Sequence, residues 1–376
     1  IVGVLGAHEA SPLLVEALKR LEYRGYDSAG IATVGATGHL ERRRALGKLV
    51  NLSDRLVHEP LPGKAGIGHT RWATHGAATE TNAHPHEAGS VAVVHNGIIE
   101  NFRALRAELS ADGAVFASET DTEVVAQLAA RHLARGDSPR EAVQATLARL
   151  DGAFALAFLF AGEPDLMIVA RRGSPLAIGH GEGEVFIGSD AIALAPLTDR
   201  ITYLEDGDWA VLTRASIDIR DADGRQVSRE MRRMAIDARQ IEKGGHRHYM
   251  SKEIEEQPTV LADLLAHYVG PDGESCLPDA DIDFAEISRV ALIGCGTASL
   301  AGHVARYWFE QIAGLPAEHD IASEFRYREP LIAPDALALF ISQSGETADT
   351  LAALRYAAGR TGRIASLVNV PESTIA

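Results

Sequence analysis

The chain has 376 residues, of which 46% are hydrophobic and 23% charged, as in globular proteins with well-formed cores. Its formal net charge is −16, and lysine and arginine form no long block, so neither nucleic acids nor anionic membranes are expected partners. Two cysteines, Cys276 and Cys295, are too few for a disulfide framework, so we expect a reducing, cytoplasmic location. No apolar stretch reaches the roughly 18–20 residues of a membrane span.

The first 219 residues combine many short apolar segments with a few helical ones. Apolar runs predict strands at 1–6, 30–34, 90–94, 152–160, 166–170, 185–187 and 209–212. Helical periodicity predicts helices at 12–22, 102–110 and 122–134. The strand at 90–94 is expected to end in a tight turn at 95–97, because Asn-Gly is a strong turn signal. Many strands with few helices favour an α+β layered domain over residues 1–219.

Residues 220–286 are polar, charged and partly helical, and we interpret them as a connector. Three further strands, at 289–294, 336–341 and 363–368, alternate with helices. This alternation is typical of an α/β, doubly wound parallel sheet with helices on both faces. Three strands are fewer than such a sheet usually has, so we expect the domain at 287–376 to be incomplete at its carboxyl end.

The segment 69–76, His-Thr-Arg-Trp-Ala-Thr-His-Gly, concentrates groups that can bind a small zwitterion. Arg71 can hold a carboxylate with two parallel hydrogen bonds, and Asp121 can hold an α-ammonium. The alternatives are that Arg71 is a structural ion-pair partner and that Asp121 caps the helix after it. We favour binding for the cluster as a whole, because packing requires none of these polar groups.

Asn96 and Gly97 offer a side-chain amide and a backbone N–H beside a strand end, which are the parts of an oxyanion hole. Taken alone, the pair would indicate only a turn, and its closeness to Arg71 makes the oxyanion hole the better interpretation. His84 and His86 have no further ligands at metal-site spacing, so packing or hydrogen bonding is favoured over a metal site.

The segment 342–347, Ser-Gln-Ser-Gly-Glu-Thr, follows a predicted strand and begins a helix. Hydroxyls and free N–H groups at a helix start form a phosphate cradle, although simple capping is the alternative. The turn at 294–297 is similar, and two such turns on one sheet could enclose a phosphosugar. Cys295, at the end of an apolar strand, is expected to be a small buried residue rather than a nucleophile.

Several motifs together resemble the glutamine–fructose-6-phosphate aminotransferase (isomerizing) family, also called glucosamine-6-phosphate synthases. They are the segments 21–30 (Leu-Glu-Tyr-Arg-Gly-Tyr-Asp-Ser-Ala-Gly), 69–76, 94–101 (Val-His-Asn-Gly-Ile-Ile-Glu-Asn), 118–123 (Ser-Glu-Thr-Asp-Thr-Glu), 247–250, 252–254, 256–258, 323–328 and 342–347. They occur in the family's order, and the resemblance extends over the whole chain.

The resemblance implies a four-layer N-terminal-nucleophile glutaminase domain followed by a three-layer sugar-isomerase (SIS) domain. In that family ammonia from glutamine passes through a channel to fructose 6-phosphate, giving glucosamine 6-phosphate for amino-sugar biosynthesis, without metal or organic cofactor, and we expect a homodimer. By matching motif, the glutamine site would comprise Arg71, Thr74, His75 and Asp121, the oxyanion hole Asn96 and Gly97, and the channel gate Trp72. The sugar-phosphate site would comprise Thr297, Ser342, Gln343, Ser344 and Thr347.

Three departures from the family pattern matter. The family begins Cys-Gly-Ile with an exposed nucleophilic cysteine, whereas this sequence begins at Ile1, so the nucleophile would precede Ile1 by two residues. The family also continues past Ala376 into a second sugar-isomerase domain that holds the isomerase acid and base. The first sugar loop, usually Cys-Gly-Thr-Ser, has Ala298 in its last place. We therefore expect a fragment that is itself inactive.

Two alternatives remain. Another class-II amidotransferase, such as a phosphoribosyl-transferring or asparagine-forming type, would not require the 342–347 loop on a parallel sheet. A sugar-phosphate sensor that has lost its nucleophile would not require Arg71, Asn96 and Asp121.

Overall fold

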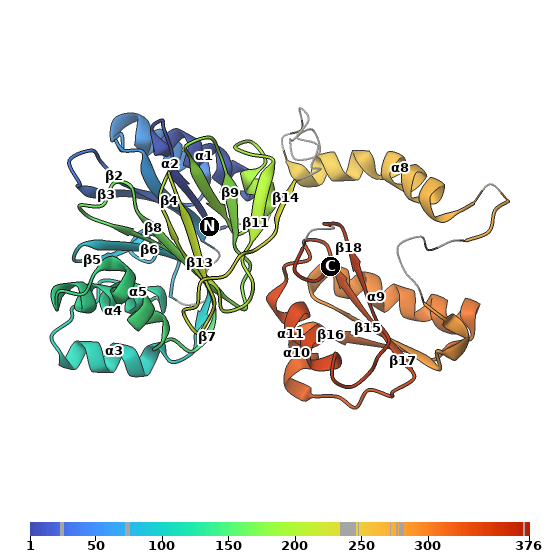
Figure 1. Ribbon diagram of the computed structural model, residues 1–376. Coiled ribbons are helices and arrows are strands. Elements are labelled where there is room, and N and C mark those ends of the chain that lie inside the picture. Colours follow the sequence, from blue (N-terminus) through green and yellow to red (C-terminus); the bar gives the residue numbers. More distant parts are fainter. Residues whose placement is uncertain are drawn as a thin grey trace. The chain divides into compact units, whose positions relative to one another are not determined.

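The computed structural model describes residues 1–22, 26–71, 76–233, 246, 248–270, 272–275, 277, 282–370 and 373–376. The chain divides into two compact units, Ile1–Gly245 and His246–Ala376 (Figure 1). Among the helices in these described ranges, none is both long and apolar enough to cross a membrane.

Two antiparallel sheets form the centre of the first unit. In the described residues their strand orders are β14-β11-β9-β10-β1-β4-β2-β3 and β13-β12-β8-β7-β6-β5. The first sheet contains β1 (Val2–Leu5), β2 (Ser28–Val34), β3 (Leu40–Leu46), β4 (Ala65–Arg71), β9 (Ala177–His180), β10 (Val185–Gly188), β11 (Arg200–Tyr203) and β14 (Met231–Arg233). The second contains β5 (His86–Ala88), β6 (Val91–Ile99), β7 (Gly152–Phe160), β8 (Met167–Arg172), β12 (Trp209–Leu212) and β13 (Ile217–Arg220).

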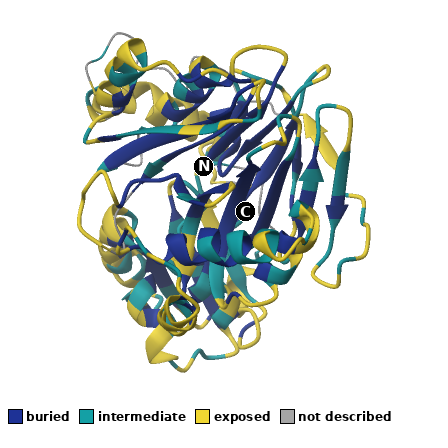
Figure 2. Ribbon diagram, turned by 90° about the vertical axis from the view of Figure 1, so that its left-hand side faces the viewer, coloured by how far each residue is buried: buried dark blue, intermediate teal, exposed yellow. Residues whose placement is uncertain are grey.

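The helices cover the outer faces of these sheets. They are α1 (Ala10–Lys19), α2 (Leu49–His58), α3 (Phe102–Ala111), α4 (Thr122–Ala134), α5 (Pro139–Leu147) and the short α6 (Ala191–Leu194). One core joins α1, α2 and α6 to the first sheet, a second joins α3, α4 and α5 to the other sheet, and a third lies between the sheets. The result is the predicted four-layer arrangement, in which the central strands are buried and the helices expose their outer sides (Figure 2).

Strand β7 shows why its sequence is almost uniformly apolar. Its side chains alternate between the two faces of the sheet. Phe158 packs in the core against the helices, while the next residue, Leu159, packs in the core between the sheets, and both are fully buried. A strand covered on both faces needs apolar residues at every position.

One sequence-based expectation for this unit is contradicted by the structure. The predicted turn at 95–97 is wrong, because β6 continues through Asn96 and Gly97 to Ile99 and pairs with β7 along that length. In addition, β14 follows residue 219 and pairs with β11, so the first unit includes part of the predicted connector. The division at 219 and 286 stays a prediction.

The second unit begins with α8 (Tyr249–Tyr268) and a short 3₁₀ turn (Phe284–Glu286). Its sheet is parallel, with the order β16-β15-β17-β18 in the described residues. The strands are β15 (Arg289–Gly294), β16 (Ala317–Ile321), β17 (Ala336–Ser342) and β18 (Ile364–Val368). The expectation of three strands is wrong, because β16 was missed; its sequence, Ala-Glu-His-Asp-Ile, is too polar to predict a buried strand.

Helices cover both faces of this sheet, as expected for a doubly wound fold. They are α9 (Gly296–Trp308), which continues into a π-helical segment (Phe309–Ala313), α10 (Ala322–Arg328) and α11 (Ala348–Ala357). Side chains of α9 and the π-helical segment share one core with Leu292, while α10 and α11 share the other with Phe340. The predicted three-layer α/β class is confirmed.

Candidate active site

The start of the chain lies beside the predicted glutamine site. Strand β1 pairs with β4 so that Val2 is opposite Gly68, which places Ile1 next to His69. Ile1 is 2% exposed, and its ammonium group donates to the hydroxyl of Ser189 at 2.9 Å. Any residue joined ahead of Ile1 would therefore start from this point.

Asn96 and Gly97 lie on β6 of the opposite sheet. The Oδ1 atom of Asn96 is 2.6 Å from Nε2 of His69, so this contact joins the two sheets at the site. Gly97 has φ of +128°, and a Cβ atom there would collide with the carbonyl oxygen of Ala153. The glycine is thus required by strand geometry and close approach rather than by a turn.

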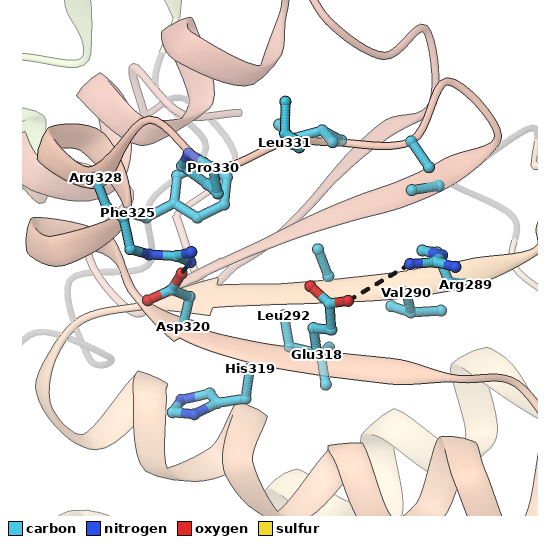
Figure 3. Close-up of a pocket in the computed structure, with 14 residues that line it drawn as sticks. Arg289, Val290, Leu292, Glu318, His319, Asp320, Phe325, Arg328, Pro330 and Leu331 are labelled. Carbon is cyan, nitrogen blue, oxygen red and sulfur yellow. Dashed lines mark hydrogen bonds and ion pairs between the residues drawn. The ribbon is translucent and has the colours of Figure 1, made fainter.

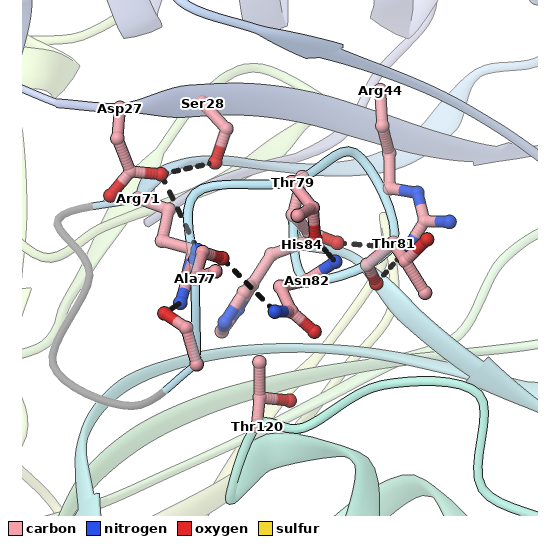
Figure 4. A network of polar contacts seen from close by, with 12 residues as sticks. Asp27, Ser28, Arg44, Arg71, Ala77, Thr79, Thr81, Asn82, His84 and Thr120 are labelled. Atoms are coloured by element: carbon pink, nitrogen blue, oxygen red, sulfur yellow. Dashed lines mark hydrogen bonds and ion pairs between the residues drawn. The ribbon is translucent and has the colours of Figure 1, made fainter.

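Arg71, at the end of β4, is 4% exposed and is already engaged by groups of the protein. Its Nη2 donates to the carbonyl of Gly76 at 3.0 Å and its Nη1 to that of Ala77 at 3.2 Å, with Asp27 Oδ1 at 3.4 Å (Figure 4). The ion pair of the structural alternative therefore exists. The loop at Gly76 and Ala77 therefore accepts two of the hydrogen bonds that the Arg71 guanidinium can donate.

The loop that contains Gly76 and Ala77 is also held by hydrogen bonds that involve Asn82 and Glu119. Asn82 Nδ2 donates to Ala77 O at 3.0 Å and to Glu119 Oε2 at 3.3 Å, while the Glu119 N–H donates to Asn82 Oδ1 at 2.9 Å. These hydrogen bonds connect the loop after Arg71 to the segment that precedes Asp121. The segments that carry Arg71 and Asp121, two predicted glutamine ligands, are therefore connected by hydrogen bonds.

Asp121 is 4% exposed and does not cap the helix that follows it. Its Oδ2 accepts from the backbone N–H of Ile99 at 2.8 Å, and His95 Nδ1 lies 3.9 Å away. The capping alternative is therefore wrong. The carboxylate is instead tied to the strand that carries Asn96 and Gly97.

Four buried imidazoles lie around Asn96 and Asp121: His69, His84, His86 and His95. His84 accepts from the His95 backbone N–H at 3.2 Å, and His86 Nε2 lies 3.0 Å from Thr120 Oγ1, so both make the predicted packing and hydrogen-bond contacts. Burial, followed by the charge of Arg44, lowers the pKa of His86 to about 3. Burial also lowers the pKa of His69 and His84 well below the ordinary value. These three rings are neutral at neutral pH.

Three predicted site residues, Trp72, Thr74 and His75, lie outside the described residues. Their roles as channel gate and glutamine ligands stay predictions. Within the described part of the chain, no group of three or more His, Cys, Asp or Glu residues is arranged to hold a metal ion.

The second unit brings the two predicted phosphate loops to one edge of its sheet. Strands β15 and β17 are parallel neighbours, with Gly294 opposite Ile341, so the loops after them leave the same edge. Thr297 is exposed in the first turn of α9, and Gln343 is also exposed. Cys295, just before α9, packs against the apolar core but is only partly buried, whereas a buried residue was expected.

The 342–347 loop is organised by its own hydroxyls. Ser342 Oγ accepts from the Gly345 N–H and lies 3.1 Å from Thr347 Oγ1, while Ser344 Oγ accepts from the Glu346 N–H. Thr347 begins α11 without a side-chain capping bond. Simple capping therefore does not explain the cluster of hydroxyls.

The second unit also has a pocket whose lining differs from that of the predicted phosphate loops. Its cavity volume is about 70 Å³, and it lies against β15, β16 and the chain after α10 (Figure 3). Its charged groups are matched, since Arg289 pairs with Glu318 and Arg328 with Asp320. The pocket's lining includes no predicted sugar-phosphate residue among those described. It offers no excess positive charge for a phosphate.

Three residues of the site have no predicted role: Asp27, which pairs with Arg71; His69, which contacts Asn96; and Ser189, whose hydroxyl accepts from the Ile1 nitrogen. Asp27 and His69 lie within the motifs 21–30 and 69–76, but the motifs do not indicate these contacts. Ser189 follows β10 and has no local sequence signal.

Comparison with family models matches residues 69–196 to a glutamine amidotransferase domain and residues 283–376 to a SIS domain. The two matched segments lie one in each unit. Two curated relatives are both named glutamine–fructose-6-phosphate aminotransferase (isomerizing). The protein of Mesorhizobium japonicum is 60% identical and that of Bradyrhizobium diazoefficiens 61% identical, each over 100% of this chain. The resemblance inferred from the motifs is thereby confirmed, and the chain spans 62% of the length of these relatives.

A solved structure supports the fold. Glutamine phosphoribosylpyrophosphate amidotransferase from B. subtilis aligns with 98% of this chain and 81% of its own, with a TM-score of 0.53 and 18% identity. At this identity the likeness concerns the architecture alone.

Proposed function

We propose that the first unit is the glutaminase of a glutamine–fructose-6-phosphate aminotransferase. Glutamine would bind through Arg71 and Asp121, with Thr74 and His75 completing the site. A cysteine two positions ahead of Ile1 would attack the amide carbon, with its own α-amine as base, because an α-amine pKa near 8 suits proton transfer from a thiol. Asn96 and Gly97 would stabilise the tetrahedral oxyanion.

The observation that carries this proposal is the position of the amino terminus. Ile1 is held opposite His69, and His69 contacts Asn96 from the other sheet. A nucleophile joined there would start within reach of the oxyanion groups, since two residues of extended chain span at most about 7 Å. Asp121 is bonded to the same strand as Asn96, so the amino-acid end and the amide end of glutamine would be held by one framework.

The second unit would bind the phosphate of fructose 6-phosphate. Thr297, Ser342, Gln343, Ser344 and Thr347 are the proposed ligands, from loops that leave one sheet edge. Backbone N–H groups at the start of α9 and α11 add partial positive charge there. Ammonia transfer to the sugar, giving glucosamine 6-phosphate, is proposed for the longer protein, as are its homodimeric state and cytoplasmic location.

The proposal is tested by joining Cys-Gly ahead of Ile1 and measuring glutamate release from glutamine. We expect release with Cys-Gly and none from the chain as printed, because neither Cys276 nor Cys295 lies within the glutamine amidotransferase match. A Ser-Gly extension is the matched control, since it has the same length and α-amine with a much weaker nucleophile. Equal rates for the Cys-Gly and Ser-Gly chains would overturn the assignment and favour a sensor.

A further inference from the structure

The contact between His69 and Asn96 determines both the tautomer of His69 and the orientation of the Asn96 amide. A carboxamide oxygen can only accept, so the 2.6 Å contact between Asn96 Oδ1 and His69 Nε2 requires the proton on Nε2. The same contact fixes which end of the amide faces His69. The Nδ2 group then points away from His69 and keeps its two donors for another acceptor.

The ring of His69 is itself held in place. It stacks on His84 with a centroid distance of 4.2 Å and an interplanar angle of 17°. Nδ1 of His84 accepts from the His95 backbone N–H, and Nε2 lies 3.4 Å from Thr122 Oγ1. His69 is therefore positioned by groups next to Asn96 on β6 and at the start of α4.

The surroundings of Nδ1, the other ring nitrogen of His69, agree with a proton on Nε2. Its Nδ1 atom is buried and has no hydrogen-bond partner among the described residues. Burial lowers the pKa of His69. The ring is thus neutral, with one proton that the contact with Asn96 places on Nε2.

We propose that His69 is a positioning residue that holds the amide of Asn96 so that Nδ2 faces the oxyanion. The inference rests on the proposed function, which assigns Asn96 to the oxyanion hole. Rotation of the amide by half a turn would present Oδ1 to the developing negative charge, and the resulting repulsion would slow the reaction. His69 disfavours that rotamer, because Nε2–H cannot pair with an amide N–H and the other tautomer would bury an unpaired Nδ1–H.

The kinetic test uses the Cys-Gly-extended chain and three variants. His69→Phe keeps a flat ring against His84 and removes the donor. His69→Gln places an N–H near the position of Nε2, whereas His69→Asn reaches only to the position of Nδ1. We expect His69→Phe and His69→Asn to lower kcat about 10²-fold, comparable with loss of an oxyanion donor, with little change in KM for glutamine. His69→Gln should restore most of the lost rate.

A double-mutant cycle separates positioning from general structural damage. If His69 acts through Asn96, His69→Phe should have no further effect on kcat in the Asn96→Ala background. Additive losses, or a changed KM with unchanged kcat, would overturn the inference. If Asn96→Ala alone leaves the rate unchanged, the oxyanion assignment itself fails. If Asn96→Ala slows the reaction but His69→Phe does not, only the positioning role fails.

A second measurement requires no activity. Nitrogen-15 NMR of the chain as printed should show His69 with its proton on Nε2 at pH 7. A proton on Nδ1 would mean that Asn96 donates to Nε2 and presents Oδ1 to the site, and it would overturn the inference.

Discussion

The two units hold their polar groups in different ways. In the first, the site lies between two sheets, and its side chains are buried and fixed by groups from both, as in the contact of His69 with Asn96. In the second, the 342–347 loop lies at the edge of one sheet and is organised mainly by its own hydroxyls, with Ser342 bonded to Gly345. Buried groups, Ser342 among them, interact strongly and tolerate little change, whereas exposed groups of the loop such as Gln343 are screened by water. Substitutions should therefore cost more in the first unit.

The largest effect is expected from Gly97→Ala. The φ of +128° is unfavourable for alanine, and its Cβ would collide with Ala153 O, so β6 would have to shift. We expect a loss of about 3 kcal/mol or more of stability, measured by calorimetric unfolding.

Gly136→Ala is the matched control for this substitution. Gly136 also has a positive φ, +95°, but a Cβ there meets nothing within 4 Å among the described residues. Its cost should be about 1–2 kcal/mol. Equal losses in the two variants would show that β6 is less constrained than the structure indicates.

Acid should destabilise the first unit through its buried imidazoles. The pKa of His86 falls from 6.5 to about 3 on folding, so between these values the unfolded state binds more protons. Its contribution to stability is complete above pH 6.5 and is lost as the pH falls toward 3. At pH 5 the loss is about 2 kcal/mol relative to pH 7.

Denaturant unfolding at pH 5 and pH 7 checks this expectation against His86→Gln, which cannot be protonated. The variant should show a smaller pH dependence than the parent chain. The same dependence in both would contradict a depressed pKa for His86.

Arg71→Lys should weaken glutamine binding by about 10-fold or more. Lysine keeps the charge but cannot form the two parallel hydrogen bonds of a guanidinium with a carboxylate. Calorimetric titration of the chain with glutamine measures the change. Arg149→Lys is the control, since Arg149 pairs with Glu108 at the surface. Unchanged affinity in Arg71→Lys would remove Arg71 from the glutamine site.

The smallest effect is expected in the second unit. Ser342→Ala removes the acceptor of the Gly345 N–H and should weaken fructose 6-phosphate binding several-fold, or by about 1 kcal/mol. Ser366→Ala on β18, where the residue is exposed, should have no effect. Titration calorimetry that finds the two variants equal would indicate that the phosphate binds elsewhere.

Much of the fold was predictable because local patterns decided it. Strand β7 and helix α4 lie within the predicted limits, since continuous apolar runs and helical periodicity are strong signals. Strand β16 was missed because it is an edge strand with one apolar residue at each end and three polar ones between. The turn predicted at Asn96-Gly97 failed because pairing with β7 outweighed the local turn preference.

For the candidate site, too, some features followed from the sequence and others only from the tertiary structure. By itself, the sequence determined which chemical groups are present, and its motifs matched the order of a known family, which identified Arg71, Asn96 and Asp121 as a set. Only the tertiary structure decided that Asp121 bonds to Ile99 instead of capping α4, that Ile1 lies opposite His69, and that His69 contacts Asn96. These contacts join residues 22 to 68 positions apart, and no local preference encodes them. They arise from strand pairing within one sheet, from the packing of α4 on β6, and from the packing of the two sheets face to face.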